Sequence, residues 1–396
     1  MASKTRARPG LEMVGLIPGC GYGDALSQYA AALDTHGLDV SWRPVHSNTD
    51  KLLERTVALA DVPEPQQPIL RRLWDRSIKV SGLFIQVPPD RWHHYWADHH
   101  ADKRLFTYVA WEVDQLPDSW APALNRYEKV FVPSRFNQEV LEQGGITSPV
   151  EVIPHIARGL RPGGKPIDLG GINDEDYLFY TIGTWTSRKA MEHTIRAFLE
   201  TFTRRDKVAL VIKSEYFDHV SLTSPLRTAD TPDYTLTTAW TLARMLADYP
   251  EAARIHLIPH RLESQQIDQL HQRGDCFISL THSEGWGLGA FEAALAGNPV
   301  VITGWGGQLE YLGTAYPWLV DSQLTSTDQS PNDGYFHHRP DVHWASADRG
   351  HACRLMREVF ERPDAACEFA HGFGQRLRAR FSAGRIAEQL LRSIAL

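Results

Sequence analysis

Short apolar runs alternate along the whole chain with longer stretches in which apolar residues recur at the three- and four-residue spacing of a helix. The short runs are rich in Val, Ile and Phe, which favours strands. Strands that alternate with helices in this way predict parallel sheets wound with helices, so we expect an α/β fold. The predicted strands cover 13–17, 38–42, 82–87, 105–111, 129–132 and 150–153 in the first half, and 177–182, 208–212, 255–258, 276–280 and 300–303 in the second.

Residues 158–173 separate the two groups of predicted strands. This stretch holds five Gly and two Pro with little apolar periodicity, so it is predicted to link two domains, at 1–160 and 174–375. The length of 396 residues agrees with two cores of ordinary size. After Asp348 the spacing is helical to the end of the chain, whereas the polar stretch 322–344 is predicted to be a long loop.

Charge and composition exclude several classes of function. The chain has 41 Lys and Arg against 48 Asp and Glu, a net charge of -7, which is the wrong sign for coating nucleic acid or anionic lipid. Any anionic ligand must therefore be held by a local cluster of cations. The hydrophobic fraction of 42% and the charged fraction of 22% are those of a globular protein.

The sequence also indicates a compartment. The four cysteines include no Cys-x-x-Cys pair, which favours thiols in a reducing compartment over a disulfide framework. The basic N-terminus lacks the apolar core of a signal peptide, and no run approaches the roughly 18 apolar residues of a membrane span. We expect a cytoplasmic protein, with peripheral association at the inner face of a membrane left open. The oligomeric state is not indicated.

The segment 279–303 predicts a buried strand, a loop with three glycines, a short helix and another strand. Ligands of open α/β sheets bind beyond the carboxyl ends of strands, where this loop lies, and its N–H groups suit a phosphate or a sugar hydroxyl. Glu284 in the loop and Glu292 in the helix can accept hydrogen bonds from paired hydroxyls. The alternative is structural, with Glu292 complementing the helix dipole and Glu284 solvated.

The segment 180–191 predicts a strand end, a turn and a helix start. Ser187 is the natural N-cap, which would place Arg188 and Lys189 in the first turn of the helix. Two cations there oppose the helix dipole at up to about 1 kcal/mol each, and a bound anion would reverse that cost. We therefore predict a phosphate site, the alternative being two solvated basic residues.

These two segments resemble the donor site of retaining glycosyltransferase family 4. The resemblance lies in Glu284-x7-Glu292 within Glu-Gly-Trp-Gly-Leu-Gly-Ala-Phe-Glu-Ala, in the following Gly-Asn-Pro-Val-Val, and in Gly306-Gly-Gln-Leu-Glu310. It implies the GT-B fold, in which two Rossmann-like, doubly wound domains face a central cleft. The N-terminal domain would bind the acceptor, the C-terminal domain would bind the nucleotide-sugar donor, and a helix at 376–396 would return toward the N-terminal domain.

The resemblance also implies roles for single residues. Glu292 would bind the ribose of the nucleotide, and Glu284 would lie by the donor sugar. The sugar and the diphosphate would be held by the loop residues Gly285, Trp286, Gly287, Leu288 and Gly289. Lys189 matches the lysine of the family's Gly-Arg-x4-Lys element, but the arginine position is Thr184, so Arg188 is expected to carry that charge. The predicted catalytic set is Glu284, Lys189 and Arg188, with Thr184 among the donor-binding residues.

A glycine-rich turn near the N-terminus is similar to the first loop of the same family. Residues 15–24 run from a strand into a helix, and Gly21 and Gly23 are predicted to contact the donor. The spacing also suggests a dinucleotide site, but its third glycine comes one residue early for that fingerprint. Lys213, at the end of a predicted strand, is a further donor-binding candidate.

Trp111 and Glu112 follow a predicted strand where many family members carry His-Glu, so the family's histidine contact is not carried over. Both residues are candidates for contact with the acceptor or the sugar, and for Glu112 a capping role is the alternative. The pair His93 and His94 and the pair His99 and His100 invite a metal hypothesis, but their spacing matches no common zinc motif. An acceptor-binding surface of His and aromatic residues is the alternative, and no metal or cofactor is predicted.

The sequence thus predicts a metal-independent enzyme that transfers a sugar, with retention, from a nucleotide-diphosphate sugar to an acceptor hydroxyl. The acceptor would be a glycan, a glycolipid or a small molecule. The main electrostatic task is to neutralise the diphosphate leaving group, and no carboxylate is assigned as a nucleophile. One alternative is a nucleotide-sugar epimerase on the same fold. Another is a non-catalytic binding protein, suggested by Thr184 and Trp111 at places that are usually functional.

Overall fold

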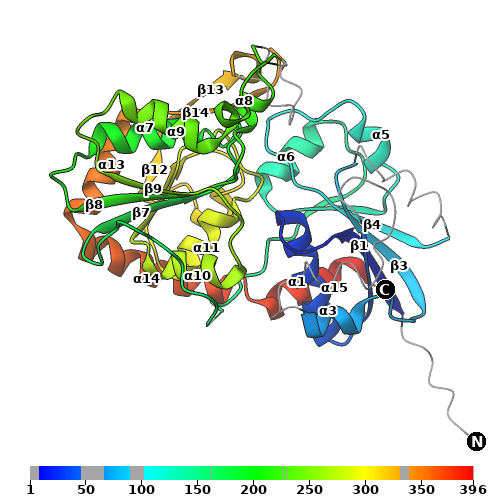
Figure 1. Cartoon of the computed structure of the whole chain (residues 1–396). Coiled ribbons are helices and arrows are strands. Elements are labelled where there is room, and N and C mark those ends of the chain that lie inside the picture. Colours follow the sequence, from blue (N-terminus) through cyan, green and yellow to red (C-terminus); the bar gives the residue numbers. More distant parts are fainter. Residues whose placement is uncertain are drawn as a thin grey trace, which may run out of the picture. The chain divides into compact units, whose positions relative to one another are not determined.

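The computed structural model describes residues 9–45, 67–89, 102–161, 163–224, 226–228, 230–330 and 339–395. The chain forms two compact units, each built on one six-stranded sheet (Figure 1). Unit 1 comprises residues 1–111, 115–158 and 379–396, and unit 2 comprises 112–114 and 159–378. The short segment 112–114 therefore belongs to unit 2, although the residues on both sides of it belong to unit 1.

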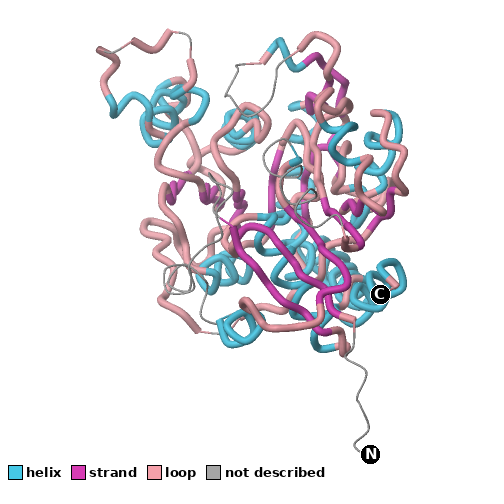
Figure 2. The backbone as a smooth tube through the Cα atoms, turned by 90° about the vertical axis from the view of Figure 1, so that its right-hand side faces the viewer, coloured by secondary structure: helices cyan, strands magenta, loops and turns pink. Residues whose placement is uncertain are grey.

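The sheet of unit 1 is entirely parallel, with the strand order β2-β1-β3-β4-β5-β6. Parallel neighbours need crossover connections, and a described helix lies between β1 and β2, β2 and β3, β4 and β5, and β5 and β6 in the chain (cyan beside the magenta strands in Figure 2). The strands are β1 (Gly10–Leu16), β2 (Asp39–Val45), β3 (Val80–Gln86), β4 (Arg104–Tyr108), β5 (Lys129–Val132) and β6 (Val150–Val152). The helices are α1 (Gly21–Thr35), α3 (Gln67–Leu73), α5 (Trp120–Leu124), α6 (Arg135–Gln143) and α15 (Ala383–Ile394), the last of which packs against α1.

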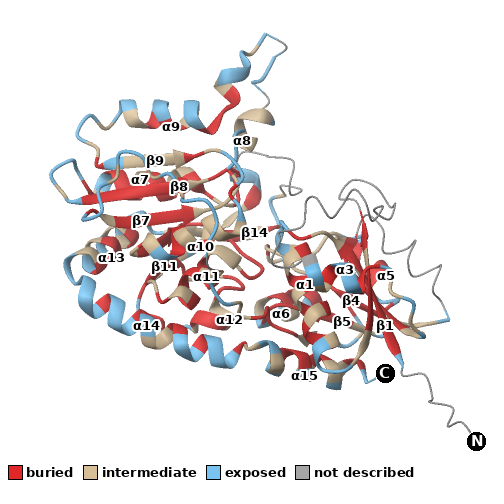
Figure 3. Ribbon diagram, turned by 60° about the horizontal axis from the view of Figure 1, so that its bottom comes forward, coloured by how far each residue is buried: buried red, intermediate tan, exposed pale blue. Residues whose placement is uncertain are grey.

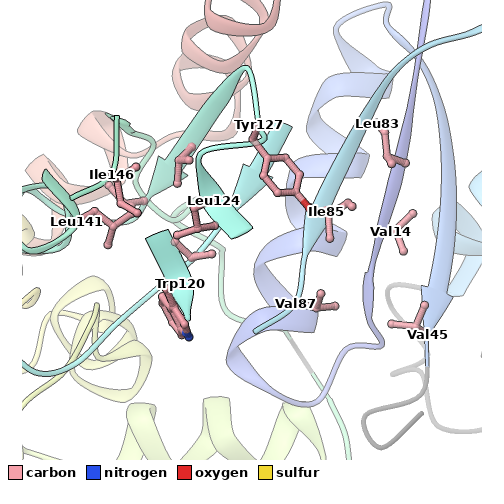
Figure 4. Close-up of a cluster of buried hydrophobic side chains, with 13 residues drawn as sticks. Val14, Val45, Leu83, Ile85, Val87, Trp120, Leu124, Tyr127, Leu141 and Ile146 are labelled. Carbon is pink, nitrogen blue, oxygen red and sulfur yellow. The ribbon is translucent and has the colours of Figure 1, made fainter. Parts of the chain in front are cut away.

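The core of unit 1 explains why its strands have continuous apolar runs. Val14 and Ile85 come from the neighbouring strands β1 and β3, and Trp120 and Leu141 come from the helices α5 and α6 (Figure 4). Parallel strands are covered on both faces, so residues of both orientations must be apolar. Because of this constraint, the strands could be recognised in the sequence as continuous apolar runs.

The sheet of unit 2 is also parallel, with the order β12-β11-β10-β7-β8-β9. Its strands are β7 (Tyr177–Ile182), β8 (Val208–Lys213), β9 (Arg254–Ile258), β10 (Cys276–Ser279), β11 (Val300–Thr303) and β12 (Leu319–Val320). The chain moves from β7 outward to β8 and β9, and then returns to β10 on the other side of β7. The sheet order therefore reverses between β7 and β10, which is where ligands bind in doubly wound folds.

Helices cover both faces of this sheet. In Figure 1, α7 and α9 lie on one side of β7 and β8, and α10 and α11 lie on the other. Figure 3 shows β7 and β8 as largely buried and much of the outer surface of α14 as exposed. The helices are α7 (Met191–Thr201), α8 (His219–Leu222), α9 (Thr238–Ala247), α10 (Ser264–Arg273), α11 (Leu288–Ala296), α12 (Leu309–Leu312), α13 (Arg349–Glu361) and α14 (Pro363–Arg380), with short 3-10 turns η2 (Asp233–Leu236) and η3 (Thr327–Gln329).

The predicted α/β fold of two Rossmann-like units is confirmed, and each predicted strand is present. The strand predicted at 105–111 ends early, at Tyr108, because the main chain of Trp111 pairs with the side chain of Asn137 instead of a neighbouring strand. None of the helices in the described ranges is long and apolar enough to cross a membrane.

The prediction that 322–344 forms a loop is wrong at both ends of this range. An antiparallel pair forms there between β13 (Ser322–Ser326) and β14 (His343–Ala347), from the Ser322 and Ala347 pair to the Ser326 and His343 pair. The short strand β12 was also not predicted. The polar composition of β13 hid its strand character, and only Trp344 and Ala345 of β14 supply the buried apolar side chains.

Candidate functional site

The loop after β7 places two cations ahead of α7. The prediction that Ser187 caps this helix is wrong, because Ala190 adopts a left-handed conformation (φ 45°) and α7 begins at Met191. Residues 187–190 form a turn closed by a hydrogen bond from the Ala190 N–H to the Ser187 carbonyl, at 3.0 Å. Arg188 and Lys189 therefore lie in a loop and not in the first turn of the helix.

A cluster of buried and half-buried ions joins this loop to the loop after β10. The Lys189 ammonium lies 2.6 Å and 2.9 Å from the two carboxylate oxygens of Glu284, and Nη1 of Arg188 lies 3.2 Å from Oε2 of the same carboxylate. Nη1 also donates to the Ser283 carbonyl at 2.5 Å, while Nη2 lies 3.6 Å from Oε1 of Glu112. The structure thus brings together all three residues of the predicted catalytic set, with Glu112 beside them.

The two carboxylates of this cluster are held in different protonation environments. Burial alone would raise the pKa of Glu284, but Lys189 and Arg188 outweigh it, and the pKa of Glu284 is lowered. Burial raises the pKa of Glu112, because Arg188 compensates only in part and the Glu284 charge adds to the increase. Burial also lowers the pKa of Lys189, against the effect of Glu284. The pKa of Glu284 thus lies below the usual range and that of Glu112 above it, so Glu112 is the more easily protonated carboxyl.

Glycines behind the loop fix the position of Glu284. A Cβ on Gly307 would stand 1.8 Å from the carbonyl oxygen of Gly285, and the Gly307 N–H donates to the Glu284 carbonyl at 2.7 Å. Gly306, with φ 104°, approaches the same carbonyl. The Gly306-Gly307 pair thus packs directly against the main chain of the Glu284 loop and holds it in place.

The other residues of the predicted donor-binding loop, 286–289, differ in burial and in the contacts they make. Gly287 has φ 85° and precedes α11, where a Cβ would meet the Glu284 side chain at 3.3 Å. Leu288 and Gly289 are half-buried in the first turn of α11. Trp286 is only 3% exposed and packs against the rings of Phe291 and Tyr311, both at 5.0 Å. The ring of Trp286 thus supports the loop from the core.

Glu292 lies in the second turn of α11, with 18% of its side chain exposed. Its Oε2 is 3.5 Å from Nε2 of His271, which is fully buried in α10.

The two other donor-binding candidates of unit 2 lie at the ends of strands. Thr184 is half-buried in the loop after β7, and Lys213 ends β8. Burial lowers the pKa of Lys213, and the nearby charge of Arg261 lowers it further, while Glu215 raises it.

The candidates in unit 1 have structural partners. A Cβ on Gly23 would stand 1.8 Å from the Ile17 carbonyl oxygen, so close approach of α1 to the end of β1 requires this glycine. Gly21 is the first residue of α1. The indole N–H of Trp111 donates to the Gln115 carbonyl at 2.7 Å, and its ring lies 4.6 Å from that of Trp120.

Some predicted residues lie outside the described part of the chain. They are His93, His94, His99 and His100, on which the metal and acceptor-surface hypotheses rested. Within the described ranges, no three His, Cys, Asp or Glu side chains gather into a group that could hold a metal ion.

Several histidines beside the site were missed. His343 of β14 holds Asp114 with its main-chain N–H at 2.7 Å and its Nδ1 at 3.0 Å, which anchors the segment that carries Glu112. His282, next to the Glu284 loop, stacks on Trp344 at 4.7 Å, and burial lowers its pKa to about 4. No local spacing marks these residues, since their partners are distant in sequence and only the tertiary fold brings them together.

Comparisons with known proteins agree with the fold described above. Residues 239–329 match the family model described as glycosyl transferases group 1, and this segment includes both Glu284 and Glu292. The resemblance to glycosyltransferases is therefore confirmed at the level of group 1. No curated protein sequence matches the chain.

Solved structures share the fold over nearly the whole chain. A sucrose-phosphate synthase from Thermosynechococcus elongatus has 13% identity and a TM-score of 0.65, with 98% of each chain covered. The Anabaena protein HepE, in complex with UDP and glucose, has 13% identity and a TM-score of 0.60, with 97% of this chain and 99% of that chain covered. A glycosyltransferase from Rickettsia africae has 13% identity and a TM-score of 0.58, with 97% of each chain covered. The chain thus has the GT-B fold.

Replacing Glu284 with Gln tests the ion cluster. The variant leaves the buried Arg188 and the half-buried Lys189 without their main counter-charge, so we expect unfolding to become easier by about 3 kcal/mol. The pKa of Glu284 is lower in the folded protein than its ordinary value of 4.5, so its stabilisation is complete above pH 4.5 and is lost as the pH falls through the folded value. The stability difference between wild type and variant, measured by denaturant unfolding at several pH values, should therefore shrink below pH 4.5.

Glu251→Gln is the matched control for this test, because Glu251 pairs with Arg204 at 2.7 Å on the surface, where both side chains are more than half exposed. Such a pair contributes at most about 1 kcal/mol. Equal effects of the two substitutions at neutral pH would contradict the account of a buried, charge-balanced cluster.

Proposed function

We propose that this protein is a retaining glycosyltransferase that moves a sugar from a nucleotide-diphosphate sugar to an acceptor hydroxyl. The observation that carries the proposal is the meeting of Lys189, Arg188 and Glu284 where the sheet order of unit 2 reverses, between β7 and β10. Two cations at that point suit a diphosphate, and a carboxylate beside them suits the hydroxyls of the sugar.

The chemistry follows from the charge that develops on the leaving group. As the bond from the anomeric carbon to the diphosphate breaks, negative charge grows on the phosphate oxygen. Lys189 and Arg188, already fixed by Glu284, stabilise that charge without having to reorganise. The acceptor attacks from the face that the diphosphate leaves, and the departing phosphate takes the acceptor proton. These cations serve in place of a metal ion.

Two further observations support the donor class. The structurally similar HepE has been solved with UDP and glucose and with UDP-glucose, which supports a nucleotide sugar as the donor here. Glu292, in the helix that follows the Glu284 loop, is proposed to bind the ribose. The free cysteines of the described residues support a reducing, cytoplasmic compartment, and peripheral association with a membrane stays part of the proposal.

A second candidate function is a nucleotide-sugar epimerase. It is favoured by the opposite pKa shifts of Glu112, which is raised, and Glu284, which is lowered. Carboxyls whose pKa values are pushed apart are the usual basis for separate acid and base roles. An epimerase needs no acceptor, however, so the two functions make different demands on the reaction mixture.

Removing the Lys189 ammonium tests the anion site. Lys189→Ala should weaken the binding of the productive nucleoside diphosphate by at least about tenfold in calorimetry, because a charge-assisted contact of roughly 1.5 to 3 kcal/mol is lost. Lys207→Ala is the control, since Lys207 is exposed on the same unit. Unchanged binding by Lys189→Ala, or an equal loss in both variants, would remove Lys189 from the donor site.

Product analysis separates the candidate functions. With a UDP-, GDP- or ADP-sugar as donor and a panel of glycan, glycolipid and small-molecule acceptors, a transferase should release nucleotide faster when its acceptor is present. Proton NMR of the product should show the anomeric configuration of the donor. An inverted product would contradict retention, whereas a changed sugar epimer without transfer would favour the epimerase.

A further inference from the structure

A chain of buried polar side chains lies directly behind Glu292. His271 of α10 and Tyr180 of β7 are both fully buried, and the Tyr180 hydroxyl lies 2.8 Å from Nδ1 of His271. Asn298, which follows α11, donates from Nδ2 to the Tyr180 hydroxyl and to the main-chain carbonyl of His271, both at 2.7 Å. Tyr180 thus comes from a strand, His271 from a helix and Asn298 from the loop that follows α11, and hydrogen bonds join all three.

The direction of the hydrogen bonds in this chain can be worked out from chemistry. A carbonyl oxygen only accepts, so the atom of Asn298 beside the His271 carbonyl must be the amide nitrogen. The same nitrogen donates to the Tyr180 oxygen, whose own hydrogen is then directed to Nδ1 of His271. With Nδ1 accepting, the neutral imidazole carries its hydrogen on Nε2, which faces Glu292.

The last link of the chain is longer than the others. Nε2 of His271 has no hydrogen bond of ordinary geometry, and Oε2 of Glu292 lies 3.5 Å from it. A buried N–H without a partner is costly, and a movement of about half an ångström by the carboxylate would close a normal bond. His271 therefore draws the carboxylate of Glu292 toward one orientation.

We infer that Asn298, Tyr180 and His271 are positioning residues that orient Glu292 to accept hydrogen bonds from the paired 2′- and 3′-hydroxyls of the nucleotide ribose. This inference rests on the proposed function, which assigns Glu292 to the ribose. None of the three residues touches the ligand in this account. They act by fixing the carboxylate before the nucleotide arrives, so less conformational freedom is lost on binding.

The test compares nucleoside diphosphates with and without the two hydroxyls. Calorimetry with UDP, GDP and ADP and with their 2′,3′-dideoxy counterparts gives a discrimination ratio for the base that binds best. The wild type should prefer the ribose form by at least about tenfold, since hydrogen bonds to a charged group contribute roughly 1.5 to 3 kcal/mol each. Tyr180→Phe, which keeps the ring and removes the hydroxyl, should lower this ratio at least threefold.

Two histidine variants and a control sharpen the result. His271→Leu should lower the ratio as Tyr180→Phe does, whereas His271→Gln, whose amide can still donate to Glu292, should retain more of it. Tyr177→Phe is the control, because Tyr177 lies on the same strand and packs against Phe179 without joining the chain. Its ratio should equal that of the wild type.

The outcomes separate this inference from the proposed function. A wild-type ratio near one would mean that no carboxylate accepts hydrogen bonds from the ribose hydroxyls. The role assigned to Glu292 would then be wrong. If the wild type discriminates and Glu292→Gln does not, yet Tyr180→Phe and His271→Leu keep the wild-type ratio, only the positioning role is overturned. A parallel loss of affinity for both nucleotide forms, with the ratio unchanged, would also overturn it, because that is the signature of a purely structural role.

Discussion

The site depends on the need to balance charge where water is largely excluded. Arg188 is 7% exposed and Glu284 is 8% exposed, and neither could remain charged there without a partner. Their pairing, with Lys189 bound to both oxygens of the same carboxylate, fixes the loop after β7 against the loop after β10. A ligand that enters therefore meets cations that are already oriented and desolvated.

The order of the strands makes this pairing possible. Lys189 and Glu284 are 95 residues apart in sequence, yet β7 and β10 are hydrogen-bonded neighbours. The carboxyl ends of both strands lie at the same edge of the sheet, and the strand order reverses between them. Backbone conformation also fixes the positions of Lys189 and Glu284. Ala190, in a left-handed conformation, delays the start of α7 until Met191, and Gly307 lets the Glu284 loop pack against its main chain.

Much of the fold could be predicted from sequence, because strands covered on both faces must be apolar throughout. The positions of Glu284 in the glycine loop and of Glu292 in the helix that follows could also be predicted, since their spacing is local. The cap at Ser187 was wrong because the pairing of Arg188 and Lys189 with Glu284, a tertiary contact, accompanies a turn in place of a helix start. The partners of Glu292 could not be predicted, because Tyr180 and His271 carry no local pattern that links them.

The proposed function requires that Arg188 and Lys189, in the loop after β7, bind the diphosphate of a nucleotide. The most direct test is calorimetry on the wild-type protein with a series that differs only in phosphate number: nucleoside, monophosphate and diphosphate, for uridine, guanosine and adenosine. For the base that binds, we expect the affinity to rise at each step, with the diphosphate at least about a hundredfold tighter than the nucleoside, as two charge-assisted contacts imply. Equal affinity for nucleoside and diphosphate would contradict it.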